Sequence, residues 1–185
     1  MEERLLAVKQ RCLNCKRCSL CKTRTNVVFG TGSPYASVMF VGEGPGENED
    51  LQGQPFVGKA GQLLDRFLYA IDLPREDVYI ANIVKCRPPH NRDPLPEEQE
   101  ACIGWLREQV KIIQPTLIVC LGRVAAQKLI DPDYRVSVDH GKIIDKGKFY
   151  MTSTLHPAAL LRFPEQKEKA FGDFLAIRDF LNRNR

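Results

Sequence analysis

The sequence predicts an α/β fold, a three-layer α/β/α sandwich around a mostly parallel central sheet of about four strands. Short, continuous apolar runs recur along the chain, which is typical of strands in a sheet covered on both faces. Segments with helical spacing of apolar residues separate these runs, and strands that alternate with helices indicate a parallel sheet. The 185 residues are enough for one sizeable core, so we expect a single domain over residues 1–185.

The expected strands are apolar and end at a glycine or a polar residue. The run Val38 to Val41 is the clearest, because it is continuous and the glycine loop 42–46 follows it. Gly122 ends a similar run, and a Lys146-Gly147 turn separates two strand-like pieces. In chain order, strands are expected at 27–29, 38–41, 78–81 with Asn82 at its end, 116–121 and within 142–154.

The expected helices carry apolar stripes or start signals. A helix begins at Pro96, because proline in the first turn and the acidic pair Glu97-Glu98 both favour a helix N-terminus. Its apolar stripe is formed by Cys102, Leu106, Val110 and Ile113. The other helices are expected at 2–10 with Leu5, Leu6 and Val8 inward, at 60–71, at 123–130 and at 166–182. The prolines within 87–94 predict a loop.

Composition indicates a soluble protein. Hydrophobic residues make up 43% and charged residues 27% of the chain, both ordinary for a globular protein, and no apolar run approaches the ~20 residues that cross a bilayer. No apolar segment follows the N-terminal Met1-Glu2-Glu3-Arg4, so we see no signal peptide. We therefore expect a cytoplasmic monomer with no membrane partner.

The positive charge is mild in amount but clustered in place. The formal net charge is +4, and the basic residues gather near the N-terminus and around the proline-rich loop. The two groups are Lys16, Arg17, Lys22 and Arg24, and Lys85, Arg87 and Arg92. Such clusters suit a phosphate backbone, and they equally suit a solvated basic surface.

Seven cysteines in a cytosolic chain indicate metal binding or chemistry rather than disulfides. Four of them recur every third residue in a polar, basic stretch with no core to bury them, at Cys12, Cys15, Cys18 and Cys21. Cys86 and Cys102 can bring two further thiolates from a loop and a helix. Both zinc and an iron–sulfur cluster accept four thiolates, and the N-terminal four alone match half of a ferredoxin pattern. Cys120 lies in an apolar strand and is expected to be a core residue.

The loop Gly42-Glu43-Gly44-Pro45-Gly46 predicts a ligand site. It follows a buried strand, at the edge where open α/β sheets bind ligands. Glycines let backbone N–H groups approach a flat or charged ligand closely. No Gly-Lys-Ser/Thr follows and the dinucleotide fingerprint is absent, so the loop is neither a Walker loop nor a Rossmann motif.

Three more residues have a functional and a structural interpretation each. Phe56 lies in a glycine-containing loop, where it can stack on a base or anchor the loop. Asn82, at a strand end, can read the N3–H and O4 edge of uracil or cap the strand. His156, before Pro157, can donate to an oxygen that gains negative charge or can be an ordinary surface or core histidine.

Several long motifs, taken in order, closely resemble the family 4 uracil-DNA glycosylases, the iron–sulfur members of the uracil-DNA glycosylase superfamily. These are the loop 42–46 with Glu49-Asp50, the segment Gly53 to Gly61, the segment Asn82 to Pro89, and His156-Pro157 through Arg162. The resemblance runs from about residue 12 to residue 182. It implies repair of DNA by hydrolysis of the bond between uracil and deoxyribose, with the base flipped out of the helix.

The resemblance also implies a [4Fe–4S] cluster and its ligands. The Arg24-Thr25 pair follows the second N-terminal ligand in the family, which selects Cys18 and, with it, Cys15; Cys86 and Cys102 match the other two. Residues 12–24 would then be a cluster-binding segment, with Cys12 and Cys21 as extra cysteines. A sliding clamp is a candidate partner.

The resemblance assigns roles within the pocket and on the DNA surface. Uracil binding is expected from Glu43, Gly44, Pro45, Phe56, Asn82 and His156, catalysis from Glu49, His156 and Glu43, and DNA binding from Lys85, Leu160, Leu161 and Arg162. Gly44 stands where other superfamily members carry an acid, so Glu49 is the first candidate for positioning water. The alternatives are a non-catalytic iron–sulfur protein that binds nucleic acid and a small-molecule hydrolase with a structural zinc.

Overall fold

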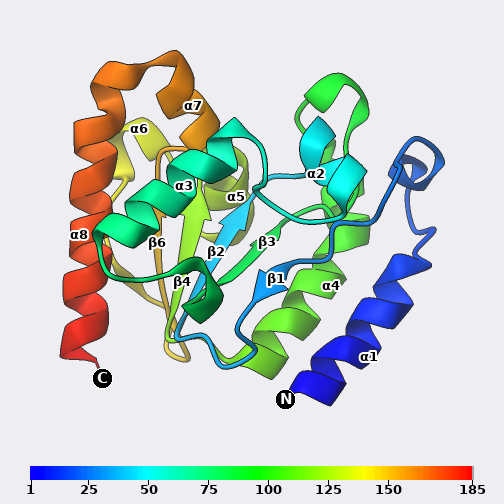
Figure 1. The fold of residues 1–185 in the computed structure, drawn as a ribbon, viewed down its shortest axis with the longest axis horizontal. Coiled ribbons are helices and arrows are strands. Elements are labelled where there is room, and N and C mark those ends of the chain that lie inside the picture. The colour runs from blue at the N-terminus through cyan, green and yellow to red at the C-terminus, as the bar shows by residue number, and fades with distance from the viewer. Residues whose placement is uncertain (185) are drawn as a thin grey trace.

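The structure is a computed structural model that describes residues 1–184. A six-stranded mixed sheet forms its centre (Figure 1). The strands are β1 (Thr31–Gly32), β2 (Val38–Gly42), β3 (Tyr79–Asn82), β4 (Leu117–Leu121), β5 (Ile144–Asp145) and β6 (Tyr150–Thr154), in the spatial order β1-β3-β2-β4-β6-β5. The four central strands are parallel, and the short edge strands β1 and β5 pair antiparallel. The predicted parallel sheet is confirmed, with six strands instead of about four.

Helices cover both faces of this sheet, which confirms the three-layer sandwich. On one face α1 (Glu2–Leu13), α4 (Pro96–Ile113) and α5 (Arg123–Leu129) pack in one apolar cluster with the strands. On the other face α3 (Lys59–Ala70) and α8 (Lys167–Arg183) form a second cluster. Shorter helices are α2 (Glu47–Gln52), α6 (Val136–Asp139) and α7 (Pro157–Arg162), and 3-10 turns lie at Ser19–Lys22, Arg75–Asp77, Pro89–Asn91 and Pro164–Gln166.

The residues of strand β2 are continuously apolar because both faces of the strand are covered. Met39 and Val41 pack into the cluster under α4, whereas Val38 and Phe40 pack into the cluster under α3 and α8. Because successive side chains of a strand point to opposite faces, a strand between two helical layers needs apolar residues at every position.

Two predicted details are wrong, and some short helices were not predicted. Residues 27–29 are buried but form no strand; the segment is fixed by single contacts, such as the Val28 N–H that donates to the Lys85 carbonyl at 2.7 Å. Leu6 is 54% exposed instead of facing inward. The short helices α2 and α7 were not among the expected elements, because one and a half turns leave too little apolar periodicity to read.

The loops that follow β2, β3, β4 and β6 meet at the carboxyl edge of the parallel strands. Strand β2 lies between β3 and β4, so its loop 42–46 sits where the chain changes direction across the sheet. Ligands of open α/β sheets bind at such switch points. Within residues 1–184, no helix has the length and apolar character needed to cross a membrane.

Candidate active site

A cavity of about 250 Å³ lies at this carboxyl edge. Its walls bring together the predicted pocket residues Glu43, Gly44, Pro45, Glu49, Phe56, Asn82, His156 and Arg162, which come from four separate segments. The volume far exceeds the roughly 30 Å³ share of one water molecule, so the cavity has room for a flat organic ligand.

Phe56 forms one wall under backbone constraint. Its φ of 52° is in the left-handed region, which is uncommon for a non-glycine residue. Arg75 fixes this conformation, because its guanidinium donates to the carbonyls of Pro55 and Phe56, the latter at 2.9 Å, and pairs with Asp65 at 2.8 Å. The ring lies 5.7 Å from the His156 ring at an interplanar angle of 29°. The loop is thus a rigid support for an aromatic face.

Glu49, on α2, joins the glycine loop to the Phe56 loop. Its Oε1 accepts hydrogen bonds from the backbone N–H groups of Val57 and Gly58, both at 3.0 Å. A Cβ added at Gly46 would lie 2.8 Å from Oε2, so the glycine makes room for the carboxylate. One carboxylate oxygen therefore braces the loop, and the side chain also lines the cavity.

Asn82 places an unsatisfied amide at the cavity. The residue is 1% exposed, and its Oδ1 has no hydrogen-bond partner among the described residues. Buried polar atoms without partners are costly and rare, so this amide is expected to pair with a bound ligand. Gly42 leaves the space for it, because a Cβ there would lie 2.5 Å from Oδ1 and 2.7 Å from Cζ of Phe56.

His156 is held in one tautomer. It is the N-cap of α7, and its Nδ1 accepts the Ala158 N–H at 3.0 Å. Burial and the nearby Arg162 lower the His156 pKa to about 4, against a smaller opposite effect of Glu49. The ring is therefore neutral at pH 7, and its proton resides on Nε2, where it is available to a ligand.

Glu43 and Gly44 define the side of the pocket nearest the glycine loop. Burial, followed by the charge of Asp93, raises the Glu43 pKa above its usual range, while Arg123 and Arg162 act in the opposite direction. A Cβ at Gly44 would lie 2.7 Å from Cγ2 of Val84. Any side chain at position 44 would therefore need Val84 to move.

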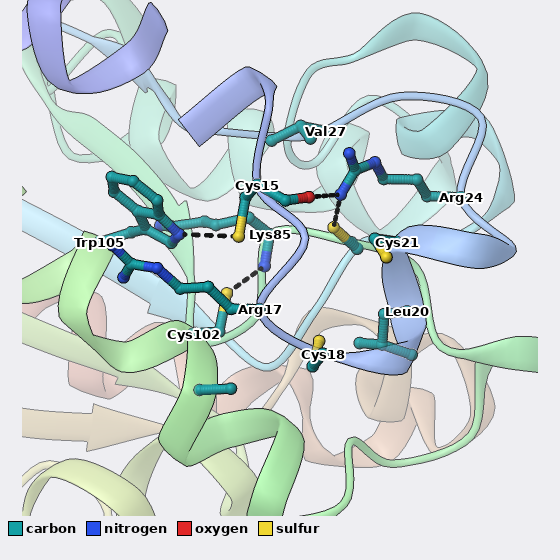
Figure 2. A pocket seen from close by; sticks show the side chains of 12 residues that line it. Cys15, Arg17, Cys18, Leu20, Cys21, Arg24, Val27, Lys85, Cys102 and Trp105 are labelled. Carbon is teal, nitrogen blue, oxygen red and sulfur yellow. Dashed lines mark hydrogen bonds between the residues drawn. The ribbon is translucent and has the colours of Figure 1, made fainter. Parts of the chain in front are cut away.

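A second cavity beside the pocket is lined by thiols (Figure 2). The predicted ligands Cys15, Cys18, Cys86 and Cys102 all line it, as does Cys21. Cys12 is instead fully buried in the core under α1, so the prediction that it has no core to bury it is wrong. Three sulfurs receive N–H donors: Trp105 Nε1 at Cys15 (3.4 Å), Arg24 Nη1 at Cys86 (3.3 Å) and the Lys85 backbone at Cys102 (3.2 Å). Such donors are typical of sulfurs that carry negative charge at a metal centre.

The arrangement of these thiols does not converge on a single ion. In the part of the chain that the structure describes, no three His, Cys, Asp or Glu side chains are placed to hold one metal ion together. In an iron–sulfur cluster each iron takes its own thiolate, so four thiolates need not converge on one ion to bind such a group. Burial raises the pKa of Cys102 to about 11, so this thiol is protonated at neutral pH unless a cationic centre binds it.

A protein-family model described as the uracil DNA glycosylase superfamily matches residues 29–177. The chain belongs to this superfamily. Three similar proteins carry the name type-4 uracil-DNA glycosylase. The one from Archaeoglobus fulgidus is 46% identical over 95% of this chain and 92% of its own length. The one from Thermotoga maritima is 48% identical over 87% and 85%, and that from Saccharolobus solfataricus 42% over 91% and 82%. The resemblance to the family 4 glycosylases is confirmed.

Two predicted DNA contacts of this superfamily member are wrong. Lys85 is 1% exposed, and its ammonium donates to the Asn82 carbonyl and to Gln109 inside the protein, so it does not reach a phosphate. Leu160 is 1% exposed and packs with Leu63 in a small core under α7. Leu161, 37% exposed, and Arg162 remain at the surface beside the pocket.

The segment 88–94 is a pocket wall that sequence reasoning missed. Pro88, Asn91, Arg92 and Pro94 line the cavity together with the predicted residues. His90 and Asn91 both have φ of 56°, and Arg87 Nε donates to Asn91 Oδ1 at 2.7 Å. Histidine and asparagine tolerate the left-handed region better than most residues, so the proline-flanked His-Asn pair was the available signal for a shaped turn.

Proposed function

We propose that this protein removes uracil from DNA by hydrolysing its N-glycosidic bond, the first step of base excision repair. The observation that carries the proposal is the unpaired Oδ1 of Asn82 in a cavity walled by the constrained Phe56 ring and the neutral His156. The names of the similar proteins, type-4 uracil-DNA glycosylases, support the same activity.

Recognition of the base uses stacking and a matched hydrogen-bond edge. A base within the duplex is out of reach, so the nucleotide is flipped into the cavity at a cost of a few kcal/mol. Phe56 stacks on its face, a contact of about 1–3 kcal/mol per base. The Asn82 amide accepts from N3–H and donates to O4 of uracil. Cytosine presents the reverse polarity at this edge, which would leave buried groups unpaired.

Bond cleavage develops charge at two places. As the bond between C1′ and N1 breaks, its electron pair moves to the uracil ring and the sugar becomes oxocarbenium-like. The Nε2–H of His156 donates to O2 of the departing uracil anion, an electrostatic stabilisation of the kind found in oxyanion holes. Water then bonds to C1′ and gives its proton to a carboxylate, which leaves an abasic site.

Two carboxylates are available to hold that water. Glu49 is the first candidate, because its charge lies next to the cavity while Oε1 keeps the Phe56 loop in place. Glu43 is the second, because it also lines the cavity, and its burial raises the pKa of the carboxyl above its usual range. DNA would be contacted beside this site by Leu161 and Arg162 on α7, an apolar wedge next to a phosphate-binding cation.

The thiol cavity fits a [4Fe–4S] cluster held by Cys15, Cys18, Cys86 and Cys102. The four thiols come from three parts of the chain, the N-terminal segment, the loop after β3 and helix α4, and N–H donors already point at three of the sulfurs. When bound, such a cluster would supply a cross-link between the N-terminal segment 12–24 and the loop after β3. Asp50 extends this link, because its buried carboxylate accepts the backbone N–H groups of Thr25 and Asn26 at 2.9 and 3.1 Å.

The test is incubation of the protein with single-stranded DNA that contains one uracil, followed by alkali, which cleaves abasic sites. Strand breakage at the uracil is the expected result, and an intact strand would contradict the proposal. The two alternatives predict an intact strand, one with DNA bound and one without. Iron and zinc analysis of anaerobically purified protein tests the cluster separately: zinc without iron would contradict it. Monomeric state, cytoplasmic location and a sliding-clamp partner stay predictions.

A further inference from the structure

Lys85 is a buried lysine that the pocket chemistry leaves without a role. Its Nζ donates to the carbonyl oxygen of Asn82 at 3.0 Å and to Oε1 of Gln109 at 2.7 Å. Gln109 cannot turn away, because its amide nitrogen donates to the Phe29 carbonyl at 2.8 Å and to the Tyr79 hydroxyl at 3.0 Å. The lysine is therefore fixed in a satisfied network behind the pocket.

The Asn82 carbonyl needs this lysine because the sheet provides no partner for it. The Ile83 N–H donates to the Gly42 carbonyl on the β2 side, and backbone groups of successive strand residues point to opposite sides. The Asn82 carbonyl therefore faces the β1 side. Strand β1 pairs only as far as Ile80, so it ends before Asn82. The Lys85 ammonium supplies the missing donor and fixes the peptide that carries the base-reading amide.

The charge of Lys85 also needs a partner. No carboxylate pairs with it among residues 1–184, and a buried ammonium without a counter-charge is unfavourable. The ionisable groups around it are thiols: Cys102, whose Sγ accepts the Lys85 backbone N–H at 3.2 Å, and Cys12. Cys102, as a thiolate of a bound cluster, would provide the negative charge that this ammonium lacks.

We propose that Lys85 is a positioning residue that joins the cluster to the base-reading amide of Asn82. The thiolate charge holds the ammonium in the core, and the ammonium holds the backbone of Asn82. The idea rests on the proposed function and explains why a lysine, rather than an apolar residue, fills this core position.

The test compares Lys85→Met, which keeps the length of the side chain but removes its charge and donors, with the wild type. Lys128→Met is the matched control, since Lys128 pairs with Glu100 at the surface. Two quantities are measured: kcat and KM for excision from single-stranded DNA, and the rate at which iron is lost to a chelator. Loss of an outer contact at a metal site typically costs about 10–100-fold. We expect a fall in kcat within that range with little change in KM, and faster iron loss in the same range.

A merely structural role would lower the unfolding temperature without changing kcat of the folded protein or the iron loss. If Lys85→Met does not fold, Lys85→Gln, whose amide tolerates burial, serves in its place with the same two expected changes. A folded variant with wild-type kcat and iron loss overturns this inference and leaves the proposed function standing. A wild type that excises no uracil overturns the proposed function and the inference with it.

Discussion

In the proposed function, base selection depends on Asn82. Its buried amide is the side chain placed to read the polar edge of the base, so Asn82→Ala should lower uracil excision by about 10²–10³-fold, the cost typical of a lost transition-state donor. DNA binding should change little, because phosphate contacts dominate affinity. Single-turnover excision and a DNA-binding titration check the two expectations. Asn182→Ala, on an exposed part of α8, is the control; equal rates for the two variants would remove Asn82 from the site.

His156 should impose a pH dependence on stability. The native ring stays neutral down to about pH 4, while an ordinary histidine in the unfolded chain takes up a proton below about pH 6.5. Because the unfolded state then binds more protons, this residue destabilises the fold as the pH falls from about 6.5 to about 4. Denaturant unfolding at several pH values should show the wild type losing stability relative to His156→Gln across that window. Parallel curves for the two proteins would contradict the lowered pKa.

At this scale the sequence predicted the pocket residues well and the DNA contacts poorly. Phe56, Asn82 and His156 follow strands or glycines at the carboxyl edge, so their chain positions already place them together. Lysine and leucine are residue types that often contact DNA at a surface, so the sequence alone suggested this role for Lys85 and Leu160. The structure shows instead that Lys85 hydrogen-bonds to Gln109 and that Leu160 packs in the small core under α7.

The short helix α2 links two loops of the pocket through Glu49. Two substitutions can separate the hydrogen bonds of Glu49 from its charge. Glu49→Gln retains an oxygen for the N–H groups of Val57 and Gly58 but loses the charge, whereas Glu49→Ala loses both. Both variants should lose about 10²–10⁴-fold in excision if the carboxylate positions water. Only Glu49→Ala should also lose stability, by about 1–3 kcal/mol for the unpaired donors. Near-normal excision by Glu49→Gln would show that Glu49 only braces the loop.

Elements with strong periodicity or long apolar runs were predictable, and short ones were not. Strands β2, β3 and β4 and helices α3, α4 and α8 lie within a residue or two of their expected bounds. Residues 27–29 have strand-like composition but remain outside the sheet, because a strand needs a partner that local sequence does not reveal. The edge strand β1 has two residues, too few for any pattern, whereas β5 and β6 lie on either side of the predicted Lys146-Gly147 turn.

In the whole molecule, one segment from the end of β3 to Cys86 contributes residues to both the pocket and the thiol cavity. Asn82 lines the pocket and Cys86 lines the thiol cavity, only four positions apart. Cysteine spacing alone left several ligand sets open. The family resemblance selected four cysteines, and the structure brings those four, with Cys21, to one cavity.

Paired cysteine variants test that ligand set. Cys18→Ser should lose most of the iron and unfold at a lower temperature, because metal binding and folding are coupled. Cys21→Ser should keep its iron, because four other thiols line the cavity. Iron content per chain and thermal unfolding provide the measurements. Iron retained by Cys18→Ser but lost by Cys21→Ser would assign the ligand to Cys21 instead.

The central claim is that the pocket reads uracil by its polar edge, and single-turnover excision from matched oligonucleotides tests it most directly. Three single strands of one sequence would carry deoxyuridine, deoxycytidine or thymidine at the same position. We expect release of uracil and not of cytosine, because the Asn82 amide would leave cytosine with mismatched polar groups. Thymine has the same polar edge as uracil, so the thymidine strand tests the shape of the pocket rather than the amide. No release from any strand, or equal release of uracil and cytosine, would contradict the account.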